Sequence, residues 1–514
     1  MRLAEIVAAL SLATDLGYGQ PMEHVLRSCC LALRLAATLG LDEAERSRVY
    51  YVGLLACVGC FADAHEQARW FGDDIDLKAD MYDVDFAGLP MMAFMMRHVG
   101  SGEPPLPRAR RRLAFMTGGR HDVEGMYVTH CMVAGTLAER LGLDAGVQSA
   151  LQHAYERWDG KGAPHGLKGE AVAISARLMR LARTVEVFYR RGGVCAAVEV
   201  ARSRRGSEFD PRLVDAFCDE AAALLEELAA TECWDAIIAA EPALRSELSE
   251  AQLDAVLEAL ADYADLKSPY ALGHSRGVAD LSAEAGRRYG LPEDDVIVLR
   301  RAALVHDLGR LGVSNTIWDK PGPLSVSEWE RVRLHPYLTQ RMLASSPTLG
   351  SLAAIAVQHH ERLDGSGYPS GTSGAGISPA ARVLSAADVY HAMTEPRPHR
   401  PALAAKAAGA KLRAEVQAGR LDGAAADAVL AAAGQRTGRR ALGPSGLTAR
   451  EIEVLRLLAR GHSNPEIAER LVITRKTASS HIEHIYAKIG VSSRAAASLY
   501  ALQHGLLPEE PLAA

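Results

Sequence analysis

The sequence has no long apolar run. None of its 514 residues belongs to a stretch of uncharged apolar residues with the length of about 18 that a transmembrane helix needs. Near the start, Glu5 falls where a signal peptide would have its apolar region. We therefore expect a cytoplasmic protein that does not enter the membrane.

Strand-like alternation of apolar and polar residues is also nearly absent. Apolar residues recur instead at intervals of three and four, as in segment 296–305, which is typical of amphipathic helices. The Ala-rich segment 402–433 is interrupted by glycines and predicts two or three short helices. We expect an all-α protein, and its length predicts several domains rather than one core.

The cysteines do not suggest a disulfide framework. All eight lie before residue 234 at irregular spacing, which in a cytoplasmic chain favours buried, reduced thiols. Cys57 and Cys60 form a CxxC pair, but no second pair and no histidine pattern accompanies them. We therefore do not expect a metal or redox site at this pair.

Histidine and aspartate gather in the second half of the chain. His306 is followed directly by Asp307, and two adjacent histidines, His359 and His360, come later. Imidazole and carboxylate groups together hold transition metals and leave open positions for water. This pattern predicts metal-dependent hydrolysis of a phosphate ester, and it fits iron, manganese and zinc equally well.

The chain also repeats itself. Segment 53–59 aligns with segment 303–309, and segment 156–164 aligns with segment 361–369. The offset between the copies is larger in the first pair than in the second, so the first copy has the longer middle insertion. A repeat of this length predicts a duplicated domain.

The first copy lacks most of the metal-binding residue types of the second. Only His24 is retained, opposite His274, and Arg183 stands opposite Asp388. The other replacements are Ala56 and Cys57 for His306 and Asp307, and Ala154 and Tyr155 for His359 and His360. Because an arginine would repel a divalent cation, we expect no metal in the first copy and interpret it as a scaffold or sensor.

The second copy, from about residue 253 to 434, contains six motifs in a characteristic order. They are Gly273-His274-Ser275, His306-Asp307-Leu308-Gly309, His335-Pro336, His359-His360-Glu361, Gly367-Tyr368-Pro369 and Ala387-Asp388-Val389-Tyr390. With these motifs the segment resembles the HD-GYP family of phosphohydrolases. The resemblance implies an all-helical fold and a binuclear or trinuclear metal centre that hydrolyses cyclic di-GMP.

The resemblance also implies individual roles. Asp307 would bridge two divalent transition-metal ions and, with Arg310, act in catalysis. The metal ligands would be His274, His306, Asp307, His335, His359, His360 and Asp388. The substrate would be bound by Arg310, Gly367, Tyr368, Pro369, Arg397 and Arg400.

The second copy departs from the family pattern at four positions. Arg310 replaces a common lysine, which keeps the charge and adds bidentate geometry. Gly277 and His391 stand where arginine and aspartate are usual. Tyr270 stands where members with a third metal carry glutamate, which favours two metals over three.

The C-terminal segment has a different character. Its motifs Leu447-Thr448-Ala449-Arg450-Glu451, Gly461 to Ala468 and Lys488-Ile489-Gly490-Val491 resemble the LuxR-type helix-turn-helix. Thr448 and Glu451 are spaced as a capping box, and segment 474–489 would be the recognition helix. The residues expected to contact double-stranded DNA are Arg475, Lys476, Thr477, Ser480, His481 and Lys488.

Charge supports this interpretation of the C-terminal segment. The net charge of −6 gives no global attraction for nucleic acid, so a DNA-binding face must be local. Five Lys or Arg residues lie between 470 and 494, against the single acid Glu483. Binding two half-sites would require a homodimer, formed through helix 494–504 or through the duplicated body.

These patterns together predict tandem HD-like helical domains, the first degenerate, followed by a four-helix LuxR-type domain. The expected ranges are 1–240, 250–434, a linker at 435–446, and 447–514. The leading hypothesis is a cyclic di-GMP phosphodiesterase coupled to a transcription regulator. Two alternatives are a non-catalytic, nucleotide-sensing transcription factor and a phosphohydrolase that acts on another nucleotide.

Overall fold

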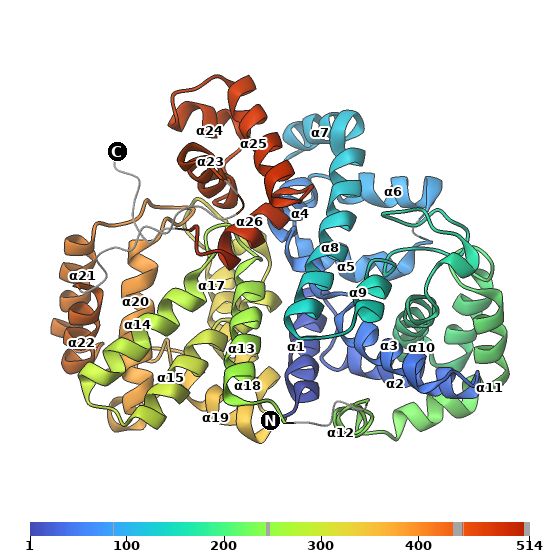
Figure 1. Ribbon diagram of the computed structural model, residues 1–514, viewed down its shortest axis with the longest axis horizontal. Coiled ribbons are helices and arrows are strands. Elements are labelled where there is room, and N and C mark those ends of the chain that lie inside the picture. Colours follow the sequence, from blue (N-terminus) through green and yellow to red (C-terminus); the bar gives the residue numbers. More distant parts are fainter. Residues whose placement is uncertain (86, 243–246, 435–444, 446, 508–514) are drawn as a thin grey trace. The chain divides into compact units, whose positions relative to one another are not determined.

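The computed structural model describes residues 1–507 except 86, 243–246, 435–444 and 446 (Figure 1). Within these residues the regular elements are all helices, apart from two isolated β-bridges, which confirms the expected all-α class. None of the described helices combines the length and apolar character that a membrane span requires. The predicted linker at 435–446 lies almost wholly outside the described residues.

The chain divides into two compact units, Met1–Leu253 and Asp254–Ala514. The first unit contains twelve of the described α-helices, and α2 and α3 pack against the long helix α10. Its helices are α1 (Leu3–Gly17), α2 (His24–Thr38), α3 (Glu43–Leu55), α4 (Ala64–Phe71), α5 (Asp74–Asp80), α6 (Gly88–His98), α7 (Pro105–Ala114), α8 (Arg120–Arg140), α9 (Ala145–Leu151), α10 (Ile174–Ser203), α11 (Pro211–Ala229) and α12 (Cys233–Ala239).

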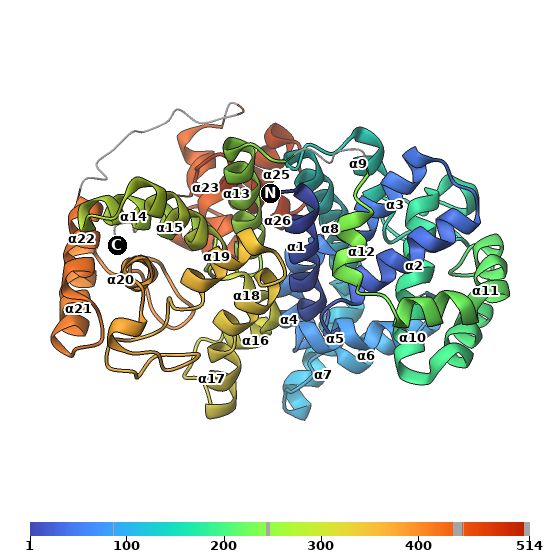
Figure 2. The ribbon, with the colours of Figure 1, turned by 90° about the horizontal axis from the view of Figure 1, so that it is seen from below.

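The second unit begins within α13 and has α14 at its centre, packed against α15, α20 and α22. Figure 2 shows α21 and α22 side by side along one edge of this unit. Its helices are α13 (Glu250–Asp265), α14 (His274–Tyr289), α15 (Glu293–Val305), α16 (Asn315–Trp318), α17 (Val326–Arg333), α18 (His335–Leu343), α19 (Pro347–Ala356), α20 (Pro379–Thr394), α21 (Ala405–Gln417), α22 (Gly423–Gly434), α23 (Ala449–Ala459), α24 (Asn464–Arg470), α25 (Arg475–Ile489) and α26 (Arg494–Gln503).

Local sequence signals explain where the key helices of the second unit begin. Ser378 accepts a hydrogen bond from the backbone N–H of Ala381, and Pro379 is the first residue of α20, as expected for a capped helix start. The helix α14 begins directly after Gly273, whose φ of 81° lies in the left-handed region that glycine tolerates. The Ala-rich segment forms the two helices α21 and α22, in agreement with the prediction.

The last four helices have a hydrophobic core of their own, built from residues such as Val454, Leu458 and Ile485. Thr448 and Glu451 form the predicted capping box at the start of α23. The predicted recognition helix is α25, and Thr474 caps it by accepting a hydrogen bond from the backbone N–H of Thr477. The four-helix arrangement therefore agrees with the prediction.

In each unit a buried glycine packs closely against the main-chain carbonyl of a histidine. A Cβ atom built on Gly59 would lie 2.0 Å from the carbonyl oxygen of His130, and one built on Gly309 would lie 1.9 Å from that of His335. His130 is therefore the counterpart of His335. The expectation that only His24 is retained in the first copy is wrong, because His130 lies opposite His335 at the same offset that relates segments 156–164 and 361–369.

Because Gly309 lies so close to the main chain of His335, we expect one added methyl group there to lower stability strongly. We expect Gly309→Ala to lower the free energy of unfolding by about 3 kcal/mol, since the new Cβ cannot fit without moving α18. Gly350→Ala is the control, because the nearest atom to its Cβ, the Ala344 carbonyl oxygen, is 3.9 Å away. The measurement is urea unfolding followed by circular dichroism, and equal midpoints for the two variants would contradict the described contact.

Candidate metal centre

Seven side chains from five places in the second unit converge on one buried site. His274 is the first residue of α14, His306 directly follows α15, Asp307 precedes a 3₁₀ turn, and His335 is the first residue of α18. The remaining three are His359 and His360, which follow α19, and Asp388, which lies within α20. Six are buried and His360 is partly buried. The structure thus brings together every residue expected to bind metal.

Three of the histidines are oriented by the main chain. The Nδ1 atoms of His306, His335 and His359 lie 2.7, 2.6 and 2.6 Å from carbonyl oxygens three residues earlier in the sequence. A carbonyl oxygen only accepts, so each Nδ1 carries a proton, and each ring in its neutral form presents a lone pair at Nε2. Hydrogen bonds of this kind commonly orient metal-binding histidines.

The three Nε2 atoms surround the carboxylate of Asp307. His335 and His359 lie 3.3 and 3.7 Å from its Oδ1 atom. His306 lies on the other side, 3.6 Å from Oδ2. The two oxygens of Asp307 therefore face different groups of ligands, which is the arrangement a bridging carboxylate needs.

Asp388 completes the site from α20. Its Oδ1 atom lies 3.2 Å from Nε2 of His274, and its Oδ2 atom lies 3.7 Å from Nδ1 of His360. His274 is also 3.8 Å from Oδ2 of Asp307. The site therefore contains two carboxylates, each with imidazole nitrogens on both of its oxygen atoms.

The donor set fits divalent cations. The Nε2 atoms of His335 and His359 face each other at 3.2 Å, although both present lone pairs. The buried Nε2 atom of His306 has no hydrogen-bond partner among the described residues. Converging lone pairs and carboxylates are stabilised by a cation, and mixed nitrogen and oxygen ligands suit transition metals.

Burial and nearby charges favour the protonation state that binds metal in most of these groups. Burial, together with the nearby His306 and His335, lowers the pKa of His359 to about 3, so its imidazole is neutral at pH 7. Burial alone would raise the pKa of Asp307, but His306 and Arg310 outweigh it and hold that pKa well below the usual value. Neutral imidazole and ionised carboxylate are the forms that bind metal.

His274 differs from the other histidines of the site. Burial favours its neutral form, but Glu395 and Asp388 outweigh burial and raise its pKa to about 10. Its Nδ1 atom lies 2.8 Å from Oε2 of Glu395. Because a metal ligand must give up its proton, a cation that binds His274 would have to displace this one.

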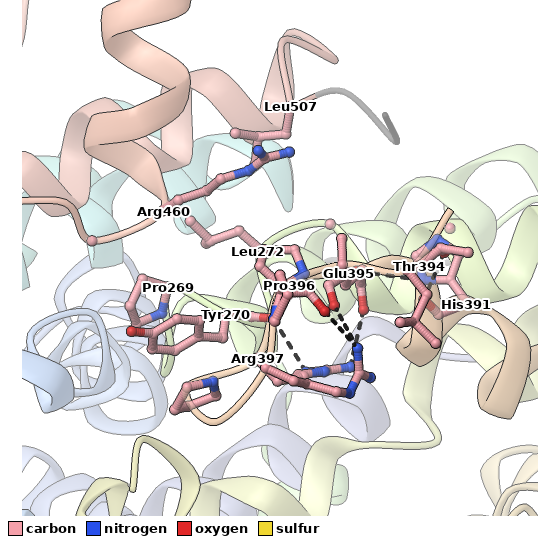
Figure 3. A pocket seen from close by; sticks show the side chains of 18 of the residues that line it. Pro269, Tyr270, Leu272, His391, Thr394, Glu395, Pro396, Arg397, Arg460 and Leu507 are labelled. Atoms are coloured by element: carbon pink, nitrogen blue, oxygen red, sulfur yellow. Dashed lines mark hydrogen bonds and ion pairs between the residues drawn. The ribbon is translucent and has the colours of Figure 1, made fainter. Parts of the chain in front are cut away.

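Sequence reasoning missed Glu395 and gave His391 no role. His391 and Glu395 form a candidate ligand group with His274, and Nδ1 of His391 lies 3.4 Å from Oε1 of Glu395. Figure 3 shows Glu395 with Arg397, whose Nη2 atom donates to its Oε2 at 3.0 Å. His391 and Glu395 are one helical turn apart and follow Asp388 closely in the sequence. This spacing could have indicated that they lie at the site.

The three predicted phosphate-binding arginines have different surroundings. Arg310 donates to Oδ2 of Asp307 at 2.9 Å and lies over the ring of Trp318. Arg397 lines a pocket beside the site together with Tyr270 (Figure 3). Arg400 lines the same pocket, but its guanidinium donates to main-chain carbonyls, including those of Ala392 and Met393. Arg400 thus caps the C-terminal end of α20.

The Gly367-Tyr368-Pro369 loop borders the metal ligands. The Tyr368 ring lies 4.7 Å from the His360 ring, and its backbone N–H donates to the His360 carbonyl oxygen. A Cβ on Gly367 would lie 2.4 Å from the backbone nitrogen of Arg362, so only glycine fits there. The loop therefore fixes Tyr368 against the centre.

The predicted DNA-binding residues are found on α25. Arg475, Lys476 and Thr477 in its first turn are exposed. Ser480 and His481 follow on the same helix and are partly buried. Lys488, at the other end, is exposed and its Nζ atom lies 2.7 Å from Oε2 of Glu451. The first turn thus presents two cations to solvent, whereas Lys488 has an internal partner.

Family models match both parts of the chain. The HD domain model matches residues 121–213 and 258–425, and the model for the luxR family of bacterial regulatory proteins matches residues 445–501. The 3′3′-cGAMP-specific phosphodiesterase 3 of Vibrio cholerae is 32% identical over 405 residues, which cover 78% of this chain and 88% of the relative. The chain belongs to the HD-domain family of metal-dependent phosphohydrolases.

Other comparisons agree with this assignment. A crystal structure of a cyclic GMP-AMP-specific phosphodiesterase of V. cholerae is 28% identical, with a TM-score of 0.59, and the match covers 85% of this chain and 98% of that one. The cyclic di-GMP phosphodiesterase response regulator RpfG of Xanthomonas campestris is 39% identical over 158 residues, 30% of this chain and 40% of the relative. This HD-domain phosphohydrolase thus carries a LuxR-type domain at its C-terminal side.

The site predicts a dependence of metal content on Asp307. We expect Asp307→Ala to weaken metal affinity by more than about tenfold, since both groups of imidazoles lose the carboxylate between them. The control is Asp294→Ala, an exposed residue in the first turn of α15. Inductively coupled plasma mass spectrometry of both purified variants gives the result, and equal metal content in the two would refute a role for Asp307.

The first turn of α25 predicts the effect of one substitution on DNA affinity. We expect Arg475→Ala to weaken binding to a fragment selected from a randomised DNA pool by about 1–3 kcal/mol. Lys406→Ala, an exposed lysine on α21, is the control and should bind as the unaltered protein does. Mobility-shift titration measures both, and an unchanged affinity for Arg475→Ala would exclude it from the interface.

Proposed function

We propose that the HD domain at 250–434 hydrolyses a 3′,5′-linked cyclic dinucleotide, and that the domain at 447–514 binds double-stranded DNA. The observation that carries the proposal is the convergence of imidazole lone pairs and two carboxylates on one buried site. The relative that covers most of the chain is named as specific for 3′3′-cGAMP, and RpfG is named as a cyclic di-GMP phosphodiesterase. Both nucleotides are therefore candidate substrates, with 3′3′-cGAMP first.

We propose two metal ions of the iron, manganese or zinc type, bridged by Asp307. The two oxygens of Asp307 face separate groups of imidazoles, which supports this number. Bound divalent cations would lower the pKa of a water molecule and stabilise the negative charge of the reacting phosphate.

The protein's own residues would orient the substrate. Arg310, partly buried beside Asp307, is placed to contact a phosphate oxygen, and its position over Trp318 limits its movement. Arg397 would contact the second phosphate from the neighbouring pocket. The water oxygen forms a bond to phosphorus while a bond to a ribose oxygen breaks, so the product is a linear dinucleotide with a terminal phosphate.

In this proposal the LuxR-type domain links the phosphohydrolase to the regulation of transcription. Leu272, directly before Gly273 and His274, packs against the core of helices α23–α26. Arg460 and Leu507 of this domain line the same pocket as Arg397 (Figure 3). Occupancy of the centre would thereby alter DNA affinity, and we propose that a homodimer acting in the cytoplasm binds two half-sites.

Turnover tests the enzymatic part of the proposal. We expect metal-loaded protein to convert 3′3′-cGAMP, and more slowly cyclic di-GMP, to linear products, and expect Asp307→Ala to lower the rate by at least about a hundredfold. Liquid chromatography of timed samples measures the products, with Asp294→Ala as the control.

Two outcomes would point to the alternatives. Binding of either nucleotide without cleavage would show a sensing protein rather than an enzyme. Cleavage of another nucleotide in preference to both would show a different substrate. Hydrolysis that persists in Asp307→Ala would place the activity outside this centre.

A further inference from the structure

A cavity of about 910 Å³ lies in the first unit. Three of its lining residues stand opposite proposed metal ligands of the second copy: Ala154 opposite His359, Tyr155 opposite His360 and Arg183 opposite Asp388. Six basic side chains line the cavity against one acid, Glu208. They are Lys78, Arg157, Lys161, Arg180, Arg183 and Arg204.

The single acid of the lining is shared. Glu208 lies 2.9 Å from Nε of Arg180, 3.0 Å from Nη1 of Arg204 and 3.9 Å from Nη1 of Arg157. Arg157 has two further aspartate partners, Lys78 lies 3.3 Å from Asp74, and Lys161 lies 3.7 Å from Asp159. Glu208 alone cannot neutralise Arg180, Arg183 and Arg204. The lining therefore keeps an excess of positive charge, which attracts an anion.

Arg183 is the least satisfied of these cations. Its Nη2 atom donates to Oη of Tyr82 at 3.1 Å, and its guanidinium lies 5.4 Å from the centre of the Tyr18 ring. Its Nε atom has no hydrogen-bond partner, and no carboxylate is within ion-pair distance, among the residues that the structure describes. A partly buried cation without a counter-ion is costly, so an anion bound at Arg183 would be stabilised.

The rest of the lining is suited to a flat ring. Five methionines contribute polarisable thioethers, namely Met81, Met91, Met92, Met95 and Met116. Five aromatic side chains join them: Tyr18, Tyr82, Phe115, Tyr127 and Tyr155. Nucleobases stack on such surfaces, and the volume lies in the range of small-molecule sites.

We propose that this cavity is a regulatory site that binds a nucleotide without hydrolysing it. The phosphate lies against Arg183, so a guanidinium takes the place that a divalent cation would take in the second domain. The base lies among the methionines and tyrosines. Ala56 and Cys57 stand where His306 and Asp307 stand in the second copy, and the nucleotide therefore remains intact.

Binding without metal tests this site, because a site built on arginine keeps its ligand in a chelator, and the Arg183 and Arg310 variants distinguish the two domains. The full chain is dialysed with EDTA and equilibrated with radiolabelled AMP, GMP, 3′3′-cGAMP or cyclic di-GMP. We expect about one equivalent of at least one nucleotide to bind, and Arg183→Ala to weaken it by at least about tenfold. Arg310→Ala, which alters the second domain, should leave this binding unchanged.

Several outcomes would overturn the proposal. They are no binding of any of the four nucleotides, binding that Arg183→Ala leaves unchanged, and binding that Arg310→Ala removes. Inorganic pyrophosphate that binds as tightly as the nucleotide would show that the base is not recognised.

A second pair of variants avoids the packed interior. Met92 lines the cavity and is 45% exposed, so a substitution there leaves the core intact. We expect Met92→Glu to weaken nucleotide binding and Met92→Lys to strengthen it, each by severalfold. Equal binding by the two variants would place the ligand elsewhere.

The cyclic dinucleotides are used as probes because this choice rests on the proposed function. The inference that the cavity of the first unit binds a nucleotide does not depend on that function. Absence of turnover with intact metal-free binding would refute only the proposed function. Turnover without metal-free binding would refute only this inference.

Discussion

Three hydrogen bonds from imidazole Nδ1 atoms to main-chain carbonyls determine what the second domain can do. They turn the Nε2 lone pairs of His306, His335 and His359 toward Asp307. Each carbonyl belongs to the residue three positions earlier, so local backbone geometry orients each ring. The arrangement of donors therefore follows from the ends of α15 and α19 and the start of α18, and the carboxylates complete it.

Much of this architecture could be predicted from the sequence because short sequence motifs indicate where helices form and begin. Helical periodicity predicted the fold class, Thr448 and Glu451 predicted the start of α23, and the expected recognition helix at 474–489 agrees with α25. The residues expected to bind metal converge because α14 packs against α15 and α20, and α18 packs against α19 and the turn after Asp307.

Other features depend on tertiary contacts that the sequence does not show. The role of Arg400 as a cap of α20 required the positions of main-chain carbonyls. The pairing of Lys488 with Glu451, 37 residues earlier in the sequence, required the packing of α25 against α23, and the contact of Lys488 with DNA stays a prediction.

Placement of the ligands at helix ends has an evolutionary consequence. Six of the seven candidate ligands lie at helix termini or in turns, and only Asp388 lies inside a helix. Their apolar neighbours, such as Leu304 and Val305, pack the interior independently of the metal. A gene duplicate can therefore exchange these ligands one at a time while its core stays folded, and the same scaffold becomes available to selection for new ligands.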